Sequence, residues 1–229
     1  MKLRNAIASI AVAGTLATMS LVPAHAANIF FNFSGVFNPT LGGGLVSYTG
    51  NVLNFSTANA STVAVLDRSN NLGLNAGVGT DITVANFGPS NSNANDTTPD
   101  TFNFNYVDAL TITPTNSSGV ALAGYSAQTL NTPTSNINGN ISANTVTSFG
   151  TGFSTPLVFT FNASGQPTLI YTVAFKNFLS FPAPKDSSLG AVQYRVTATS
   201  VPEPGAVAMF AGMGVSASLF ALKLRKRRN

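Results

Sequence analysis

Apolar and polar residues alternate along much of the chain with the period of two that is typical of half-buried β-strands. The clearest stretch is 101–106, where aromatic residues alternate with Asn103 and Asn105, and the pattern continues through 110–113. Shorter apolar or β-branched runs lie at 28–33, 45–55, 60–66, 82–87, 121–130, 141–149, 157–161, 169–175 and 191–199. No segment between 27 and 200 repeats its apolar residues every 3.6 positions, so we expect about ten strands and little or no helix there.

Turn-forming residues separate these runs. Gly42–Gly44, Asn70–Asn71 and residues 77–81 have turn compositions, and Gly165 suits a hairpin that joins 157–161 to 169–175. The Asn- and Ser-rich stretch 88–99 predicts an exposed, mobile loop. The pattern favours an all-β fold, as a single β-sandwich or jelly-roll domain over residues 27–200.

The first 26 residues have the features of a secretory signal peptide. A short positive start is followed by an apolar run at 6–22, and small residues occupy Ala24 and Ala26. These are the positions that signal peptidase reads, so we expect cleavage after Ala26. A permanent N-terminal membrane helix is the alternative, but hydroxyl residues interrupt the run and Pro23 precedes the cleavage site.

Three signals follow one another at the C-terminus. Val201, Pro202, Glu203 and Pro204 come first, an uncharged span at 205–222 follows, and a basic tail at 223–229 ends the chain. Eighteen helical residues extend about 27 Å, which is close to the thickness of one hydrocarbon core. Basic residues after a span stay in the cytoplasm, so the preceding domain should lie outside; the cations are Lys223, Arg225, Lys226, Arg227 and Arg228.

This order resembles the PEP-CTERM sorting signal, which membrane enzymes called exosortases recognise. Pro202, Glu203 and Pro204 match its motif residue by residue. The resemblance is confined to residues 201–229 and implies a Gram-negative-type envelope, processing near the motif and a final place at the cell surface or in an exopolysaccharide matrix. Independently, the two prolines keep the stretch extended and accessible to a processing enzyme.

Other interpretations of the tail fit less well. A plain Pro-rich linker before a membrane helix remains open. A GPI signal would end in apolar residues, whereas this chain ends in a basic cluster. A wall-sorting motif of the LPxTG type is missing.

Charge is distributed unevenly along the 229 residues. Seven of the eleven Lys and Arg residues lie in the terminal segments. Between 27 and 201 the chain has four Lys or Arg and six Asp, so the net charge of this body is −2. Nucleic-acid binding requires clustered cations. We therefore expect no nucleic-acid partner.

The residue inventory argues against catalysis. Beyond the signal peptide the chain has no His, Cys or Trp, and its only Glu is Glu203. A Ser-His-Asp triad and a zinc site therefore lack their usual groups. Asp96, Asp100 and Asp108 could supply a carboxylate pair, but Asp is commoner in turns. We expect no catalytic residue, no metal site and no cofactor.

Two binding hypotheses remain open in the body. Asp96, Asp100 and neighbouring Asn residues offer oxygen ligands for calcium, although their spacing matches no known calcium loop. The tyrosines could line a sugar-binding face, although Tyr at strand positions is more often half-buried; they are Tyr48, Tyr106, Tyr125, Tyr171 and Tyr194.

The sequence thus predicts a protein exported across the inner membrane, transiently anchored by its C-terminal helix, and then released or displayed at the cell surface or in the matrix. Signal peptidase and an exosortase are its expected processing partners, and exopolysaccharide is a possible partner afterwards. The body is expected to have a non-enzymatic structural or adhesive role. The alternative is a surface-displayed carbohydrate-binding module.

Overall fold

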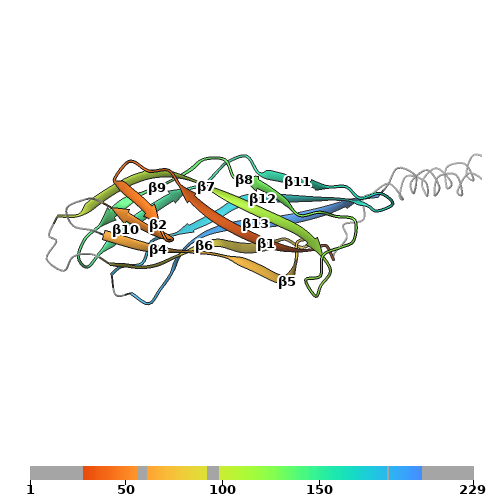
Figure 1. The fold of residues 1–229 in the computed structure, drawn as a ribbon, viewed down its shortest axis with the longest axis horizontal. Helices are drawn as coiled ribbons and strands as arrows, with labels where there is room; N and C mark the ends of the chain where they lie inside the picture. The colour runs from red at the N-terminus through yellow and green to blue at the C-terminus, as the bar shows by residue number, and fades with distance from the viewer. Residues whose placement is uncertain (1–27, 56–60, 92–97, 185, 203–229) are drawn as a thin grey trace, which may run out of the picture.

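The computed structural model describes residues 28–55, 61–91, 98–184 and 186–202. They form thirteen β-strands and no helix, which confirms the all-β prediction. The strands run along the long axis of the molecule in two antiparallel sheets that face each other as in a β-sandwich (Figure 1).

Sheet A contains six strands in the order β10-β9-β7-β1-β5, with β8 also paired to β7. Along one edge, β7 pairs with β9 over 100–106 and with β8 over 109–112, while β1 pairs with the opposite edge over 106–115. The members of sheet A are β1 (Phe30–Pro39), β5 (Ser69–Asn75), β7 (Asp100–Thr115), β8 (Gln128–Asn131), β9 (Ser135–Ile141) and β10 (Val146–Thr151).

Sheet B contains seven strands in the order β11-β12-β13-β6-β4-β3-β2. Its long central strands are β12, β13 and β6, each of 12 residues. The members are β2 (Leu45–Thr49), β3 (Val52–Phe55), β4 (Ser61–Asp67), β6 (Thr80–Asn91), β11 (Leu157–Phe161), β12 (Thr168–Leu179) and β13 (Gly190–Val201).

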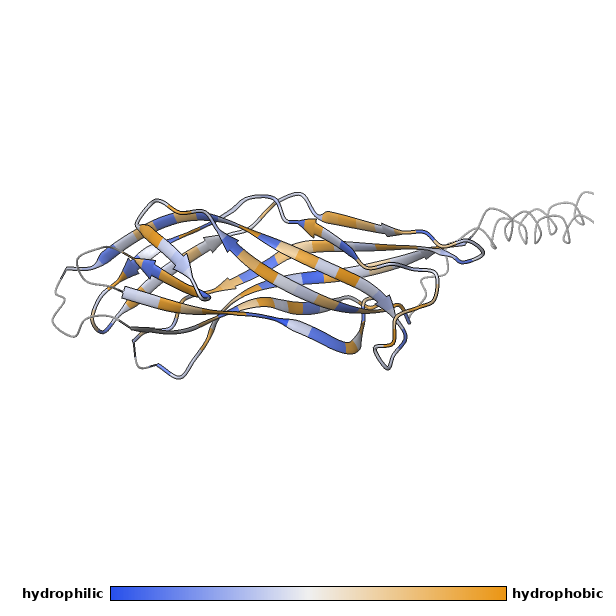
Figure 2. Ribbon diagram, in the orientation of Figure 1, coloured by the Kyte–Doolittle hydropathy of each residue, from blue (hydrophilic) through white to orange (hydrophobic). Residues whose placement is uncertain are grey.

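The hydrophobic core lies between the two sheets. Hydrophobic and hydrophilic residues alternate along the strands, as Figure 2 shows, and in β7 every second residue from Asp100 to Ile112 is buried. Aromatic rings from the two sheets contact one another, which adds about 0.5–1.5 kcal/mol per pair to the effect of burial. Contacts across the core join Phe55 to Phe102 (4.7 Å between ring centroids), Phe37 to Phe87 (5.4 Å) and Phe31 to Tyr171 (5.8 Å).

The chain passes from sheet B to sheet A at Arg68, the single residue between β4 and β5. The Arg68 amide donates to the Val84 carbonyl of β6 (3.0 Å), and its carbonyl accepts from the Gly35 amide of β1 (2.8 Å). The neighbouring Asp67 accepts a hydrogen bond from the Phe37 amide (2.9 Å). Corners where a strand changes sheet leave backbone groups unpaired, and these three bonds satisfy them.

The predicted hairpin of 157–161 and 169–175 is confirmed, with Phe161 opposite Leu169 in the β11–β12 ladder. The single strand predicted over 45–55 is wrong. Gly50 and Asn51 both have positive φ (57° and 61°), and Thr49 pairs with Val52. This two-residue type I′ turn divides the segment into the hairpin β2–β3.

Four other segments differ from the sequence prediction. β5 covers Asn70–Asn71, where a turn was expected, because its polar side chains suit an exposed strand paired only with β1. In 121–130 only the last residues join a strand, because Ala121 makes just an isolated bridge to Thr115 and β8 begins at Gln128. The predicted strand 141–149 contains the 142–145 turn between β9 and β10. The expected loop 88–99 begins as strand, because β6 continues to Asn91, and residues 92–97 lie outside the described part.

Candidate functional site

The processing residues expected from the sequence fall mostly outside the described part of the chain. This applies to the signal peptide with Ala24 and Ala26, to Glu203 and Pro204, and to the span 205–222 with its basic tail. In the described residues no helix is long and apolar enough to cross a membrane. The signal-peptide and transmembrane helices therefore stay predictions.

Two residues of the expected sorting motif, Val201 and Pro202, are described. Val201 is the last residue of β13, it pairs with Thr168, and it is 45% exposed. Pro202 follows immediately, and because proline has no amide hydrogen it cannot extend the ladder. Sheet B therefore ends directly at the motif.

The carboxylates that were considered for catalysis or calcium binding do not converge. Asp100 and Asp108 both point into the core from β7, eight residues apart, which corresponds to about 27 Å in a strand. A glycosidase pair requires a separation of about 5–9.5 Å. Asp100 accepts a hydrogen bond from the Ser61 hydroxyl (2.6 Å) and is 6% exposed, whereas Asp96 lies outside the described residues. No group of three or more His, Cys, Asp or Glu side chains meets in the described part.

Asp108 lies between the sheets in a polar cluster that the sequence did not indicate. Its side chain is fully buried, and Oδ2 accepts a hydrogen bond from the Tyr194 hydroxyl of β13. The Asp108 amide donates to Thr132 Oγ1 (2.9 Å), and the Thr132 amide donates to the Asp108 carbonyl (2.8 Å). Asp108 Oδ1 has no hydrogen-bond partner among the described residues. The Asp108–Tyr194 bond thus links sheet A to sheet B through the core.

Burial raises the pKa of Asp108 from its ordinary value of 3.8 to about 7. The hydrogen bond from Tyr194 acts in the opposite direction, and the negative charge of Asp67 adds to the rise. Burial, followed by the charge of Asp108, also raises the pKa of Tyr194, which stays a neutral donor at physiological pH. The side chains of this cluster are buried in the core, so they can affect stability but cannot bind a large ligand.

The tyrosines do not form an exposed sugar-binding face. Tyr106, Tyr171 and Tyr194 are at most 1% exposed, and Tyr48 and Tyr125 are partly buried against the core. The Tyr171 hydroxyl donates to the Phe30 carbonyl (2.9 Å), so it joins the sheets rather than facing solvent. A carbohydrate site on this protein would require other residues.

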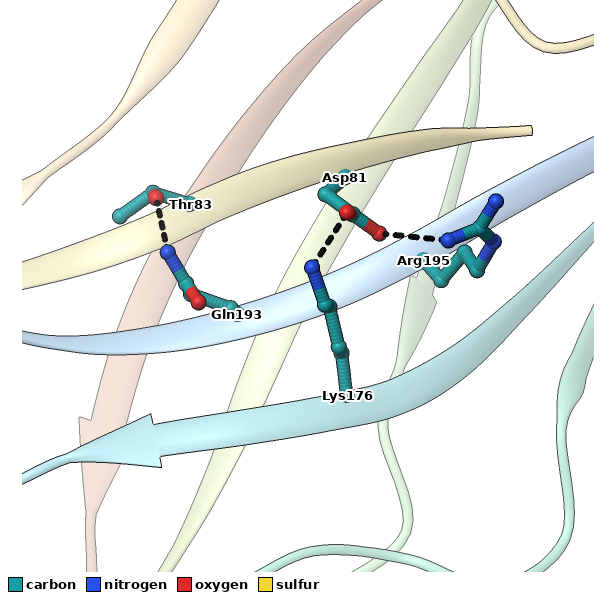
Figure 3. Close-up of polar contacts among 5 residues, drawn as sticks. All are labelled: Asp81, Thr83, Lys176, Gln193 and Arg195. Atoms are coloured by element: carbon teal, nitrogen blue, oxygen red, sulfur yellow. Dashed lines mark hydrogen bonds and ion pairs between the residues drawn. The ribbon is translucent and has the colours of Figure 1, made fainter.

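A small charged cluster lies on the outer face of sheet B (Figure 3). Asp81 of β6 forms ion pairs with Lys176 of β12 and with Arg195 of β13 (3.5 Å). Beside it, Gln193 donates to the Thr83 hydroxyl (3.4 Å). The charged side chains are 36–50% exposed, and the Asp81 carboxylate pairs with both cations, so the cluster fits cross-strand pairing better than ligand binding.

The outer face of sheet A carries a regular array of amide side chains. We define the amide–aromatic face as Asn103 and Asn105 of β7, Asn136, Asn138 and Asn140 of β9, and Phe149 of β10. Asn103 lies opposite Asn138, Asn105 opposite Asn136, and Phe149 opposite Asn138, so the three strands present them side by side. All six residues occupy positions that alternate with buried ones.

Hydrogen bonds organise this array around the Asn136 amide nitrogen. Asn136 Nδ2 donates to Asn103 Oδ1 (2.7 Å), to Asn105 Oδ1 (3.1 Å) and to the Phe104 carbonyl (3.1 Å). Asn138 Nδ2 in turn donates to Asn136 Oδ1 (3.3 Å). The side-chain nitrogens of Asn103 and Asn105 donate no hydrogen bond to another described residue.

The sequence contained part of this signal. Asn103 and Asn105 were recognised as the polar positions of β7, but the alternation of Asn136, Asn138 and Asn140 was missed because 135–140 was not predicted as a strand. Phe149 could not be assigned to a face, since that required the position of the 142–145 turn.

Comparisons with known proteins add no assignment, because the chain matches no protein-family model, no curated protein sequence and no solved structure.

Proposed function

We propose that the chain is an exported protein that an exosortase processes and that acts at the cell surface or in the extracellular matrix. Its two-sheet body, taken as a single β-sandwich domain over 27–200, would have a structural or adhesive role without catalysis. The observation that carries the proposal is the order of the C-terminal signals: Pro202–Pro204, an uncharged 18-residue stretch and a basic tail.

The end of the fold is compatible with this processing. β13 stops at Val201, which is half-exposed, and Pro202 begins the motif. A membrane enzyme would therefore find its motif beside the folded domain rather than at the end of a long linker. After cleavage near Pro204 the whole two-sheet body would remain.

The composition supports the non-enzymatic part of the proposal. Between 27 and 202 the chain lacks His, Cys and Glu, and the carboxylates Asp100 and Asp108 are buried and far apart. The body also carries few charges, four Lys or Arg and six Asp between 27 and 201, which is compatible with a protein that contributes bulk and contacts to a matrix.

The test is the intact mass and cell fractionation of the protein in its host, with and without the exosortase gene. We expect loss of residues 1–26 in both strains and loss of the segment after Pro204 only when the exosortase is present. A Pro202→Ala/Pro204→Ala variant should keep its tail, whereas Pro133→Ala, in an exposed loop, should be processed normally. A membrane-bound product that still carries residues 223–229 in the wild-type strain would reduce the chain to a simple tail-anchored protein.

A further inference from the structure

We propose that the amide–aromatic face is a binding site for an uncharged polysaccharide. This inference rests on the proposed function only for its orientation, since export places the face outside the cell. The ligand class follows from three properties of the face: its charge, its ordered donors and its exposed ring.

The face carries no charge. None of its six members is ionisable, and the neighbouring outward positions on the same strands are Thr101, Thr147 and Thr151. Nucleic acids, acidic polysaccharides and anionic lipid surfaces are recognised by Lys and Arg side chains, which are absent from these positions. The complementary ligand is therefore polar but neutral, and it offers many hydroxyl groups to amide donors and acceptors.

The amide groups are ordered before any ligand binds. Asn136 Nδ2 holds the side-chain oxygens of Asn103 and Asn105, so their nitrogens are oriented away from that contact. Backbone bonds also hold β7 on its other edge here, because the Thr40 amide donates to the Asn105 carbonyl (2.7 Å). Donors that are already fixed lose little entropy on binding, which favours hydrogen bonds to ligand hydroxyls.

Phe149 supplies the apolar part of the site. Its side chain is 70% exposed, and it is the single aromatic among the strongly exposed large hydrophobic residues of the described part. The Asn103–Asn138–Phe149 row crosses three strands and spans about 10 Å at the usual strand spacing. A pyranose ring could stack its C–H face on Phe149 while the next sugars of the chain reach Asn138 and Asn103. Aromatic side chains combined with a few fixed polar groups are the usual composition of ligand sites.

The position of the face suits a surface protein. Ser148, next to Phe149, accepts from the Phe181 amide (2.7 Å), which places β10 beside the end of β12, where Leu179 pairs with Ala191 at the start of β13. Val201 lies at the other end of β13, and the stretch from 192 to 201 alone measures about 30 Å. Figure 1 shows β9 and β10 at the end of the molecule opposite to the C-terminal end of β13. A domain attached through Pro202 would present this face away from the attachment point.

The test is co-sedimentation of the purified full-length chain with insoluble uncharged polysaccharides, namely cellulose, chitin and a β-1,3-glucan, with alginate as the charged comparison. We expect binding to at least one uncharged probe that changes little between low and high salt. Phe149→Ala should weaken that binding about tenfold, the amount expected for losing one ring contact of about 1.4 kcal/mol. Phe149→Tyr keeps an aromatic ring and should bind like the wild type, whereas Asn103→Ala should weaken binding several-fold.

Matched controls separate the face from the rest of the surface. Val158→Ala removes an exposed hydrophobic residue from the outer face of sheet B, and Asn131→Ala removes an exposed amide at the end of β8; both should bind like the wild type. Melting temperatures of all variants should agree, because these side chains are exposed.

The proposal is overturned if no uncharged probe retains the wild type, or if Phe149→Ala binds as well as the wild type. Loss of a dimer in Phe149→Ala without any polysaccharide binding would also overturn it and would assign the face to self-association. None of these results depends on tail cleavage, so normal processing in the host would leave the proposed function standing.

Discussion

The buried carboxylate Asp108 should make the stability of the domain depend on pH in a range where few other groups titrate. Its pKa rises from 3.8 to about 7 on folding, chiefly because burial penalises the charged form. A raised acid pKa means that the folded state keeps a proton that the unfolded state has released. The contribution of Asp108 to the free energy of unfolding is therefore fully present below about pH 4 and is lost as the pH rises through about 7.

The magnitude follows from the same values. At about 1.4 kcal/mol per pH unit, a rise from 3.8 to about 7 corresponds to about 4 kcal/mol between pH 4 and pH 8. This is a large part of the 5–15 kcal/mol that is typical of a folded domain. The groups that face Asp108 do not change this window: Tyr194 and Tyr106 stay neutral across it, and Asp67 adds a negative charge that only deepens the effect.

Urea unfolding of the purified full-length chain between pH 4 and pH 9 measures this effect. The chain has no Trp, and its five tyrosines lie between 48 and 194, so tyrosine fluorescence reports on the two-sheet body alone. Asp108→Asn keeps the shape of the side chain and an acceptor for Tyr194. We expect it to remove most of the fall in the free energy of unfolding with rising pH. Asp186→Asn changes an exposed carboxyl and should keep the wild-type profile. Parallel profiles for the wild type and Asp108→Asn would refute the reasoning.

Three further variants test packing and pairing by urea or thermal unfolding. Gly35→Ala should destabilise by roughly 1–3 kcal/mol, because its Cβ would lie 2.7 Å from Val84 Cβ and 3.0 Å from the Val84 carbonyl oxygen; unchanged stability would mean that β1 and β6 can move apart. Ser61→Ala should cost about 1–3 kcal/mol, because it leaves the buried Asp100 carboxylate without this donor, and a loss below about 0.5 kcal/mol would contradict that role. Asp81→Asn should cost less than about 1 kcal/mol and lose its effect at high salt, since the ion pairs are exposed; a larger, salt-independent loss would contradict this.

Local patterns predicted the elements whose residues alternate strictly. β7 was recognised because aromatic residues alternate with Asn103 and Asn105, and the β11–β12 hairpin because two apolar, β-branched and aromatic runs flank a loop that contains Gly165. β5 and β9 escaped prediction because Asn dominates them, and Asn has a low intrinsic preference for strands. Their backbone pairing with β1 and β7 outweighs that preference. Gly50 and Asn51 are typical turn residues, but they were overlooked because the apolar run 45–55 favours one strand.

Sequence alone was enough to predict the all-β class and the inward positions of the regular strands, because each depends on residues close together in the chain. The Asp108 cluster and the amide–aromatic face depend on pairing between distant residues. Asp108 meets Tyr194 across 86 positions, and Asn103 meets Asn136 across 33. The register of β7 against β9 sets the Asn103–Asn136 contact, and the packing of sheet A on sheet B sets the Asp108–Tyr194 contact. No local pattern encodes a register between strands so far apart in the chain.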